Sequence, residues 1–159
     1  MRGEDGRGPA TALSAAVTAR FGLPSVEAVS VALHLGDLPE DRLDELCEVL
    51  FAVAAAGDAV ASRVVTRLAA EIEALVRVAA GRLSLLDTAY TVVLGGGVLT
   101  ARHPQLHTDV LARLAALSPQ ASVTVLSSPP VAGAALLALD ALHGGPVPAT
   151  VEAAVRAGL

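Results

Sequence analysis

The stretch that decides the fold is Tyr90-Thr91-Val92-Val93-Leu94-Gly95-Gly96-Gly97. Its first part is short, apolar and β-branched, and glycines bound it, which is typical of a buried parallel strand. The three glycines allow positive φ angles and let a ligand approach the backbone without interference from a Cβ atom. Ligands bind beyond the carboxyl ends of strands in open α/β sheets, so these glycines are the first candidate binding residues. A tight glycine-rich turn without a ligand is the alternative.

The segment after the glycines repeats the strand-then-helix pattern. Apolar residues from Leu106 to Leu117 predict an amphipathic helix, and Ser122–Leu126 predicts a second strand. Ser127 and Ser128 are expected to cap a helix over Val131–Leu142, and a last helix is expected over Thr150–Ala157. Residues 87–159 are therefore predicted to form a β-α-β-α unit. Two parallel strands make a poor sheet alone, so we expect further strands to pair with them.

Residues 1–86 are predicted to be a helical segment. Helices are expected over Thr11–Phe21, over Val26–Leu35 with Ser25 as N-cap, and from Glu40 to Ala56. Asp58 is expected to cap the longest helix. The predicted buried stripe of that helix comprises Val60, Val64, Leu68, Ile72, Leu75 and Ala79. The expected fold class is α/β, with a helical N-terminal segment before the β-α-β-α unit.

Composition excludes several classes of protein. The sequence contains no lysine, so neither a Walker phosphate loop nor a Schiff-base lysine can be built. A net charge of −5, with no basic run and few aromatic residues, argues against nucleic acid as a partner. We expect no signal peptide and no membrane span, and therefore a cytoplasmic protein. Cys47 is the one cysteine, and its helical apolar surroundings favour a buried structural thiol.

Other polar residues receive structural interpretations. His103 and His107 have a metal-like spacing, but a metal site needs three or four converging ligands, so structural or surface roles are favoured. A solvated acidic face is the preferred interpretation of the carboxylates near Glu40, namely Asp37, Glu40, Asp41, Asp44, Glu45 and Glu48. A dinucleotide-binding fingerprint fits poorly, because its third glycine would fall on Thr100.

Taken together, the motifs resemble a known family. The segment from Val92 to Leu99, followed about thirty residues later by Pro129–Leu139, is similar to the C-terminal signature of the BadF/BadG/BcrA/BcrD ATPase family, which includes N-acetylglucosamine kinases. The resemblance implies part of an actin-like, ribonuclease H-like ATPase lobe and the use of ATP with magnesium. It implies nucleotide-binding residues Gly95, Gly96, Gly97 and Val98, and a hinge or connecting motif with Pro130, Ala132, Gly133 and Ala134.

The departures from the family pattern shape the functional expectation. The sequence has no Asp-Gly-Gly-x-Ser/Thr-Lys, Gly-Thr-Gly-Ser or Gly-Asp-Glu-Gly-Ser-Gly segment, and phosphoryl transfer depends on such positioning. We therefore expect the C-terminal portion of an ATP-dependent amino-sugar kinase that phosphorylates N-acetylglucosamine or glucosamine. It is expected to lack the N-terminal lobe and to be inactive alone, as a truncated product, misassigned start or expressed fragment.

Two alternatives remain at this point. The first alternative is that the chain is a non-catalytic module, which either binds nucleotide or forms a homodimer that covers its strand edge. The third interpretation is an activator ATPase of a radical dehydratase, which lone Cys47 disfavours because those proteins use a bridging cysteine cluster.

Overall fold

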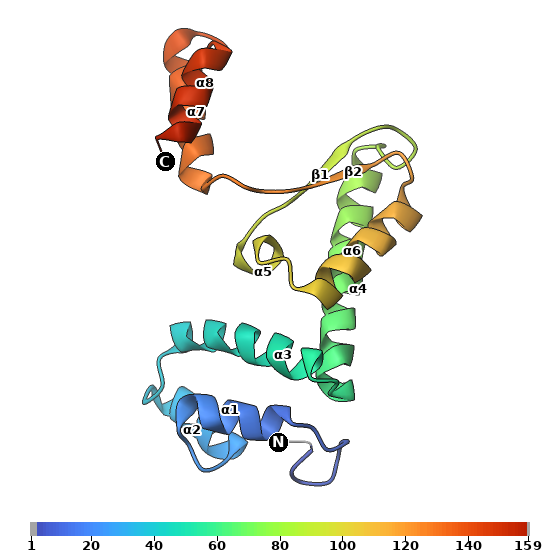
Figure 1. The fold of residues 1–159 in the computed structure, drawn as a ribbon, viewed down its shortest axis with the longest axis vertical. Helices are drawn as coiled ribbons and strands as arrows, with labels where there is room; N and C mark the ends of the chain where they lie inside the picture. The colour runs from blue at the N-terminus through green and yellow to red at the C-terminus, as the bar shows by residue number, and fades with distance from the viewer. Residues whose placement is uncertain (1–2, 159) are drawn as a thin grey trace.

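The computed structural model describes residues 3–158 and is mixed α/β, mostly helical with a small sheet (Figure 1). In chain order its elements are α1 (Leu13–Phe21), α2 (Val26–Leu35), the 3-10 helix η1 (Glu40–Asp44), α3 (Glu45–Ala55), α4 (Ala59–Arg82), β1 (Thr91–Leu94), α5 (Gly97–Thr100), α6 (Pro104–Leu117), β2 (Ser122–Val125), α7 (Pro130–His143) and α8 (Ala149–Ala157). The predicted boundary at residues 86 and 87 falls in the connection between α4 and β1.

Side-chain caps fix two of the helix starts, as predicted. The Ser25 hydroxyl accepts a hydrogen bond from the Ala28 amide at 3.0 Å. Asp58 accepts from the amides of Val60 and Ala61 at the start of α4. These bonds satisfy amide groups that have no partner inside the helix. The prediction that Ser127 and Ser128 cap α7 is wrong, because Pro129 is the N-cap residue and no side chain caps this helix.

The buried stripe of helix α4 matches the predicted one only in part: Leu68 and Ile72 pack against the core, but the fully buried positions lie on a neighbouring row. Ala61, Val65 and Ala69 are fully buried, whereas Val64 is 45% exposed and Leu75 is 72% exposed. Apolar residues occupy two adjacent rows of α4, so periodicity alone does not say which row faces inward. The packing of α3 and α6 against α4 selects the row with the small alanines, which lets the helices approach closely.

One hydrophobic core joins the helical segment to the sheet. It contains buried residues of α3 and α4 together with Leu94, Leu106, Val110 and Leu114. Arg113 of α6 adds a polar link at its edge, where its guanidinium lies 3.2 Å from Glu73 of α4 and 2.9 Å from Asp109. The core therefore holds α6, and with it the sheet, against α4.

The sheet consists of two parallel strands, as predicted. Thr91 pairs with Ser122 and Leu94 with Val125, and within the described chain no further strand pairs with either one. Val92 and Leu94 of β1 lie on the side of the core. Val93 and Thr124 alternate onto the other face and are exposed. One sheet face and both outer edges are therefore uncovered among residues 3–158.

Helices α7 and α8 form a hairpin that stands apart from the helical body, beyond the carboxyl end of β2 (Figure 1). Ala132 is the buried residue of α7, whereas Leu137 and Leu142 are exposed. Of the other predicted hinge residues, Pro130 begins α7, Ala134 is exposed, and a Cβ added to Gly133 would have no heavy atom within 4 Å. Among residues 3–158, the surface of α7 at Gly133 and Ala134 is therefore uncovered, whereas Ala132 is buried.

Between residues 3 and 158, no single helix is both long and apolar enough to cross a bilayer; two bent helix pairs reach the required length and composition only together.

Candidate functional site

The glycine turn connects β1 to the short helix α5. Gly96 has φ 85° and ψ 153°, a backbone conformation that is essentially restricted to glycine. Its carbonyl oxygen accepts hydrogen bonds from the amides of Leu99 and Thr100 at 3.1 and 3.0 Å. Gly95, Gly96 and Gly97 are all exposed. The turn is therefore held in a conformation that presents bare backbone at the carboxyl end of β1.

A cavity of about 490 Å³ lies between this turn and helix α3. Its lining residues come from both sides and are Asp44, Cys47, Glu48, Gly97, Val98, Ala101 and His103. Two of the predicted nucleotide-binding residues, Gly97 and Val98, are among them. Gly95 and Gly96 precede the cavity rather than line it, and the predicted hinge residues of α7 lie outside it. The volume lies within the roughly 300–1,000 Å³ of small-molecule sites.

His103, which follows the glycine turn and α5, contacts helix α3 directly. Its ring stacks on Phe51 of α3, with ring centroids 3.8 Å apart and planes 9° apart. Phe51 is itself buried in the core, so the stack anchors the start of α6 onto α3. No group of three His, Cys, Asp or Glu side chains within the described residues converges to hold a metal ion. The structure thus gives His103 a packing role beside the cavity.

Two carboxylates form the α3 side of the cavity. Asp44 makes no ion pair within residues 3–158, and Glu48 lies 4.0 Å from Arg20, at the limit of an ion pair. Carboxylates only accept hydrogen bonds, so a ligand here must present donors such as hydroxyl or amino groups. A phosphate placed against the same side would be repelled by their charge. The cavity therefore suits the nucleoside part of a nucleotide better than its phosphates.

Sequence reasoning missed the α3 side of this cavity. Asp44 and Glu48 are exposed, as the predicted solvated acidic face requires, whereas Cys47 is only partly buried; all three also line the cavity, which the sequence did not indicate. Their spacing held a usable signal, because residues four apart lie on one helix face. The information that this face is turned toward Gly97 comes only from the packing of α3 against the start of α6.

Comparison with protein-family models, with curated proteins and with solved structures finds no match. The assignment of the cavity therefore rests on its own geometry and chemistry. The resemblance to the BadF/BadG/BcrA/BcrD family stays a prediction.

Ion pairs hold the N-terminal end of α3, where the two cavity carboxylates lie. Glu45 accepts hydrogen bonds from Arg42 at 2.8 Å and from Arg20 of α1 at 2.6 Å. The hydrogen bond from Arg42, followed by that from Arg20, lowers the pKa of Glu45 from its usual 4.5 to about 2. Arg42 also lies over the Phe21 ring, 5.2 Å from its centroid. The charged form of Glu45 is thus favoured by folding.

This pKa shift predicts an acid-dependent loss of stability. Because the folded-state pKa is depressed, the contribution of Glu45 is complete above about pH 4.5 and is lost as the pH falls toward 2. Glu45→Gln should therefore be less stable than wild type at pH 6, and the difference should shrink between pH 4.5 and 2. Urea unfolding at a series of pH values measures this. Glu71→Gln, whose pair with Arg67 is exposed and 3.6 Å long, should follow the wild-type profile.

Proposed function

We propose that this chain is the adenosine-binding half of an ATP-dependent amino-sugar kinase, and that a second protein segment supplies the phosphate-binding and sugar-binding parts. The observation that carries the proposal is the cavity in which exposed backbone at Gly97 faces two carboxylates, Asp44 at the end of η1 and Glu48 of α3. The family resemblance supplies the reaction and the sugar class. The proposal places the protein in the cytoplasm, where ATP is available.

Hydrogen-bonding chemistry supports adenosine as the ligand of this cavity. Ribose hydroxyls and the exocyclic amine can donate hydrogen bonds to the carboxylates of Asp44 and Glu48. Val98 and Ala101 give the opposite side an apolar surface against which a base can lie. Because Gly97 has no side chain, and nothing lies within 4 Å of where its Cβ would be, a flat ring can reach its backbone.

The sheet supports dependence on a second segment. Parallel sheets normally have both faces covered, and independent stability normally needs three or more strands. Among residues 3–158, no further strand covers the outer edges of the two strands, and Val93 and Thr124 lie on an exposed face. A segment that adds strands to this sheet would cover these surfaces, and it would also bring the phosphate loops that this sequence does not contain.

Magnesium does not fit the residues of this chain. Its ligands are oxygens in near-octahedral geometry, usually one or two carboxylates, the substrate phosphates and waters. The carboxylates nearest the candidate site face the nucleoside cavity, and no three acidic, histidine or cysteine groups converge within residues 3–158. We therefore assign no magnesium ligand to this chain. In the proposed kinase, the metal belongs with the phosphates and the second segment.

Adenosine titration of the isolated chain tests the binding part of the proposal. Adenosine should shift the amide signals of Cys47, Gly97 and Val98 saturably in an NMR experiment. Glu48→Gln should weaken this binding about three- to tenfold, because a hydrogen bond to a charged acceptor becomes one to a neutral acceptor. Glu71→Gln, an equivalent charge loss on exposed α4 surface outside the cavity, should change it less than about twofold. Equal losses in both variants would contradict the site.

The kinase part needs a separate experiment. The chain is mixed with a separately produced segment that carries the phosphate loops of the family, and ATP-dependent phosphorylation of N-acetylglucosamine and glucosamine is measured. Turnover is expected only in the mixture. If both proteins are folded, adenosine binds and no turnover occurs, then the kinase assignment is wrong although the cavity remains a nucleoside site.

The uncovered strand edges also favour a second candidate, a module that dimerises without catalysis. Exposed edges present unpaired amide and carbonyl groups that readily pair with another chain. Light scattering over a range of concentrations distinguishes the two. A dimer that persists when the phosphate-loop segment is added would support the module. A monomer that joins that segment one to one would support the kinase half.

A further inference from the structure

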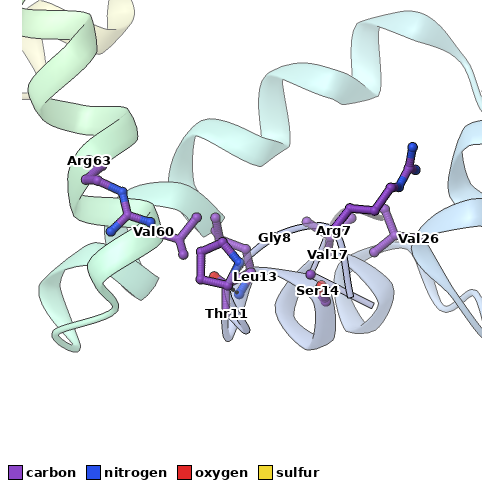
Figure 2. A pocket seen from close by; sticks show the side chains of 11 residues that line it. Arg7, Gly8, Thr11, Leu13, Ser14, Val17, Val26, Val60 and Arg63 are labelled. Atoms are coloured by element: carbon purple, nitrogen blue, oxygen red, sulfur yellow. Dashed lines mark hydrogen bonds between the residues drawn. The ribbon is translucent and has the colours of Figure 1, made fainter. Parts of the chain in front are cut away.

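A second cavity, of about 460 Å³, lies at the opposite end of the helical segment from the sheet. It is an open pocket lined by the chain around Pro9, by α1 and α2, and by the first turns of α4 (Figure 2). Leu13, Val17, Val26 and Val60 give it an apolar wall. It shares no lining residue with the cavity at the glycine turn, so it is an independent site.

Arg63 is the cation available to a ligand in this cavity. The described residues offer it no ion pair and no hydrogen bond. Arg7 also lines the cavity, but its Nε donates to Asp5 at 2.7 Å and its amide donates to the same carboxylate at 3.0 Å. The charge of Arg7 is therefore largely offset. Figure 2 shows the two arginines at opposite ends of the row of apolar side chains.

Of the two hydroxyl groups in the cavity, those of Thr11 and Ser14, one remains available for a hydrogen bond to a ligand. The Thr11 hydroxyl is already engaged, because it donates to Asp58 at 2.9 Å. The Ser14 hydroxyl lines the cavity and has no hydrogen-bond partner within residues 3–158. Asp58, the nearby anion, does not line the cavity. Four hydrogen bonds, from Ala61, Ala12, Thr11 and Val60, hold its pKa below the usual value.

We propose that this cavity binds a small organic monoanion, a carboxylate on an apolar body. A guanidinium binds a carboxylate through two parallel N–H donors, and Arg63 at one end of the cavity has these donors unused by the described part of the chain. The apolar body lies along Leu13, Val17, Val26 and Val60, and a polar group at its far end can reach Ser14. The inference does not depend on the nucleoside cavity or on kinase activity.

The test compares hexanoate with 1-hexanol, which share a chain length and differ in charge. Hexanoate should shift the amide signals of Leu13, Ser14, Val26 and Val60 saturably, with a dissociation constant on the order of 1 mM for so small a ligand. The neutral alcohol should bind about tenfold more weakly, since it cannot form the charged pair with Arg63.

Matched arginine variants locate the charge that matters. Arg63→Gln should weaken hexanoate binding about tenfold and abolish the preference over hexanol. Arg67→Gln removes the same charge one helical turn away, outside the cavity, and should leave binding within about twofold of wild type. Equal binding of alcohol and acid, equal effects of the two substitutions, or unsaturable shifts at the four amides would each overturn the proposal. Circular dichroism confirms that both variants are folded.

Discussion

Replacement of Leu106 by alanine is expected to lower the free energy of unfolding by about 2–5 kcal/mol. Leu106 is 1% exposed and lies in the core where α6 meets α4 and β1. The substitution removes buried methyl groups and leaves a cavity that the close-packed alanines of α4 cannot fill. Domains of this size are stable by only about 5–15 kcal/mol, so this loss is a large share of the total. Urea unfolding followed by circular dichroism measures it.

Leu142→Ala is the matched control for this prediction. It is the same chemical change at a residue that is 86% exposed on α7, and its effect should stay within about 0.5 kcal/mol. If Leu106→Ala does not fold, Leu106→Met, which nearly conserves volume, should still fold and lose less than about 1.5 kcal/mol. Similar effects of Leu106→Ala and Leu142→Ala would show that α6 does not form the described core.

Replacement of Gly96 by alanine has the largest expected effect on the candidate site. The φ of 85° with ψ of 153° is strongly unfavourable for any residue with a Cβ atom, at a cost of about 1–3 kcal/mol. A Cβ at this position would meet no heavy atom within 4 Å, so the cost is conformational and not steric crowding by neighbours. The backbone should relax toward negative φ and move Gly97 away from α3. Adenosine binding should fall at least tenfold, as measured by the same NMR titration.

Gly97→Ala separates the backbone effect from the added methyl group. It places a methyl one residue later, at the start of α5, where φ is not positive and nothing lies within 4 Å of the new Cβ. Its stability should stay close to that of wild type, although the methyl group narrows the cavity. If Gly96→Ala binds adenosine as wild type does, the glycine turn does not position the nucleoside.

Local chemistry made much of the fold predictable. Ser25 and Asp58 were identified as caps because their side-chain oxygens satisfy amides within three residues along the chain, which no distant contact has to decide. Both strands were found from short β-branched runs ended by turn residues, and their parallel pairing followed from the helix between them. The glycine turn was predicted because three consecutive glycines after a strand indicate a backbone with positive φ angles, and Gly96 has such an angle.

Errors arose where two local choices were almost equal in energy. In α4, Val64 and Val65 are equally apolar neighbours, and only contact with α3 and α6 buries the second and exposes the first. At the start of α7, Ser127 and Ser128 have the chemistry of caps, but Pro129 takes the N-cap position and Arg156 of α8 donates to the Ser128 hydroxyl instead. Short-range propensity cannot rank such alternatives because their difference comes from contacts distant in sequence.

The sequence by itself determined the main helices, the two strands, the caps Ser25 and Asp58 and the place of the glycine turn, since these depend on interactions between near neighbours along the chain. The tertiary structure alone decided which face of α4 is buried and that Asp44 and Glu48 face Gly97 across a cavity. It also decided that Arg63, which has no partner among residues 3–158, lies at the end of an apolar pocket. Each of these joins residues separated by tens of positions, and the stacking of His103 on Phe51 and the core around Leu106 bring such residues together.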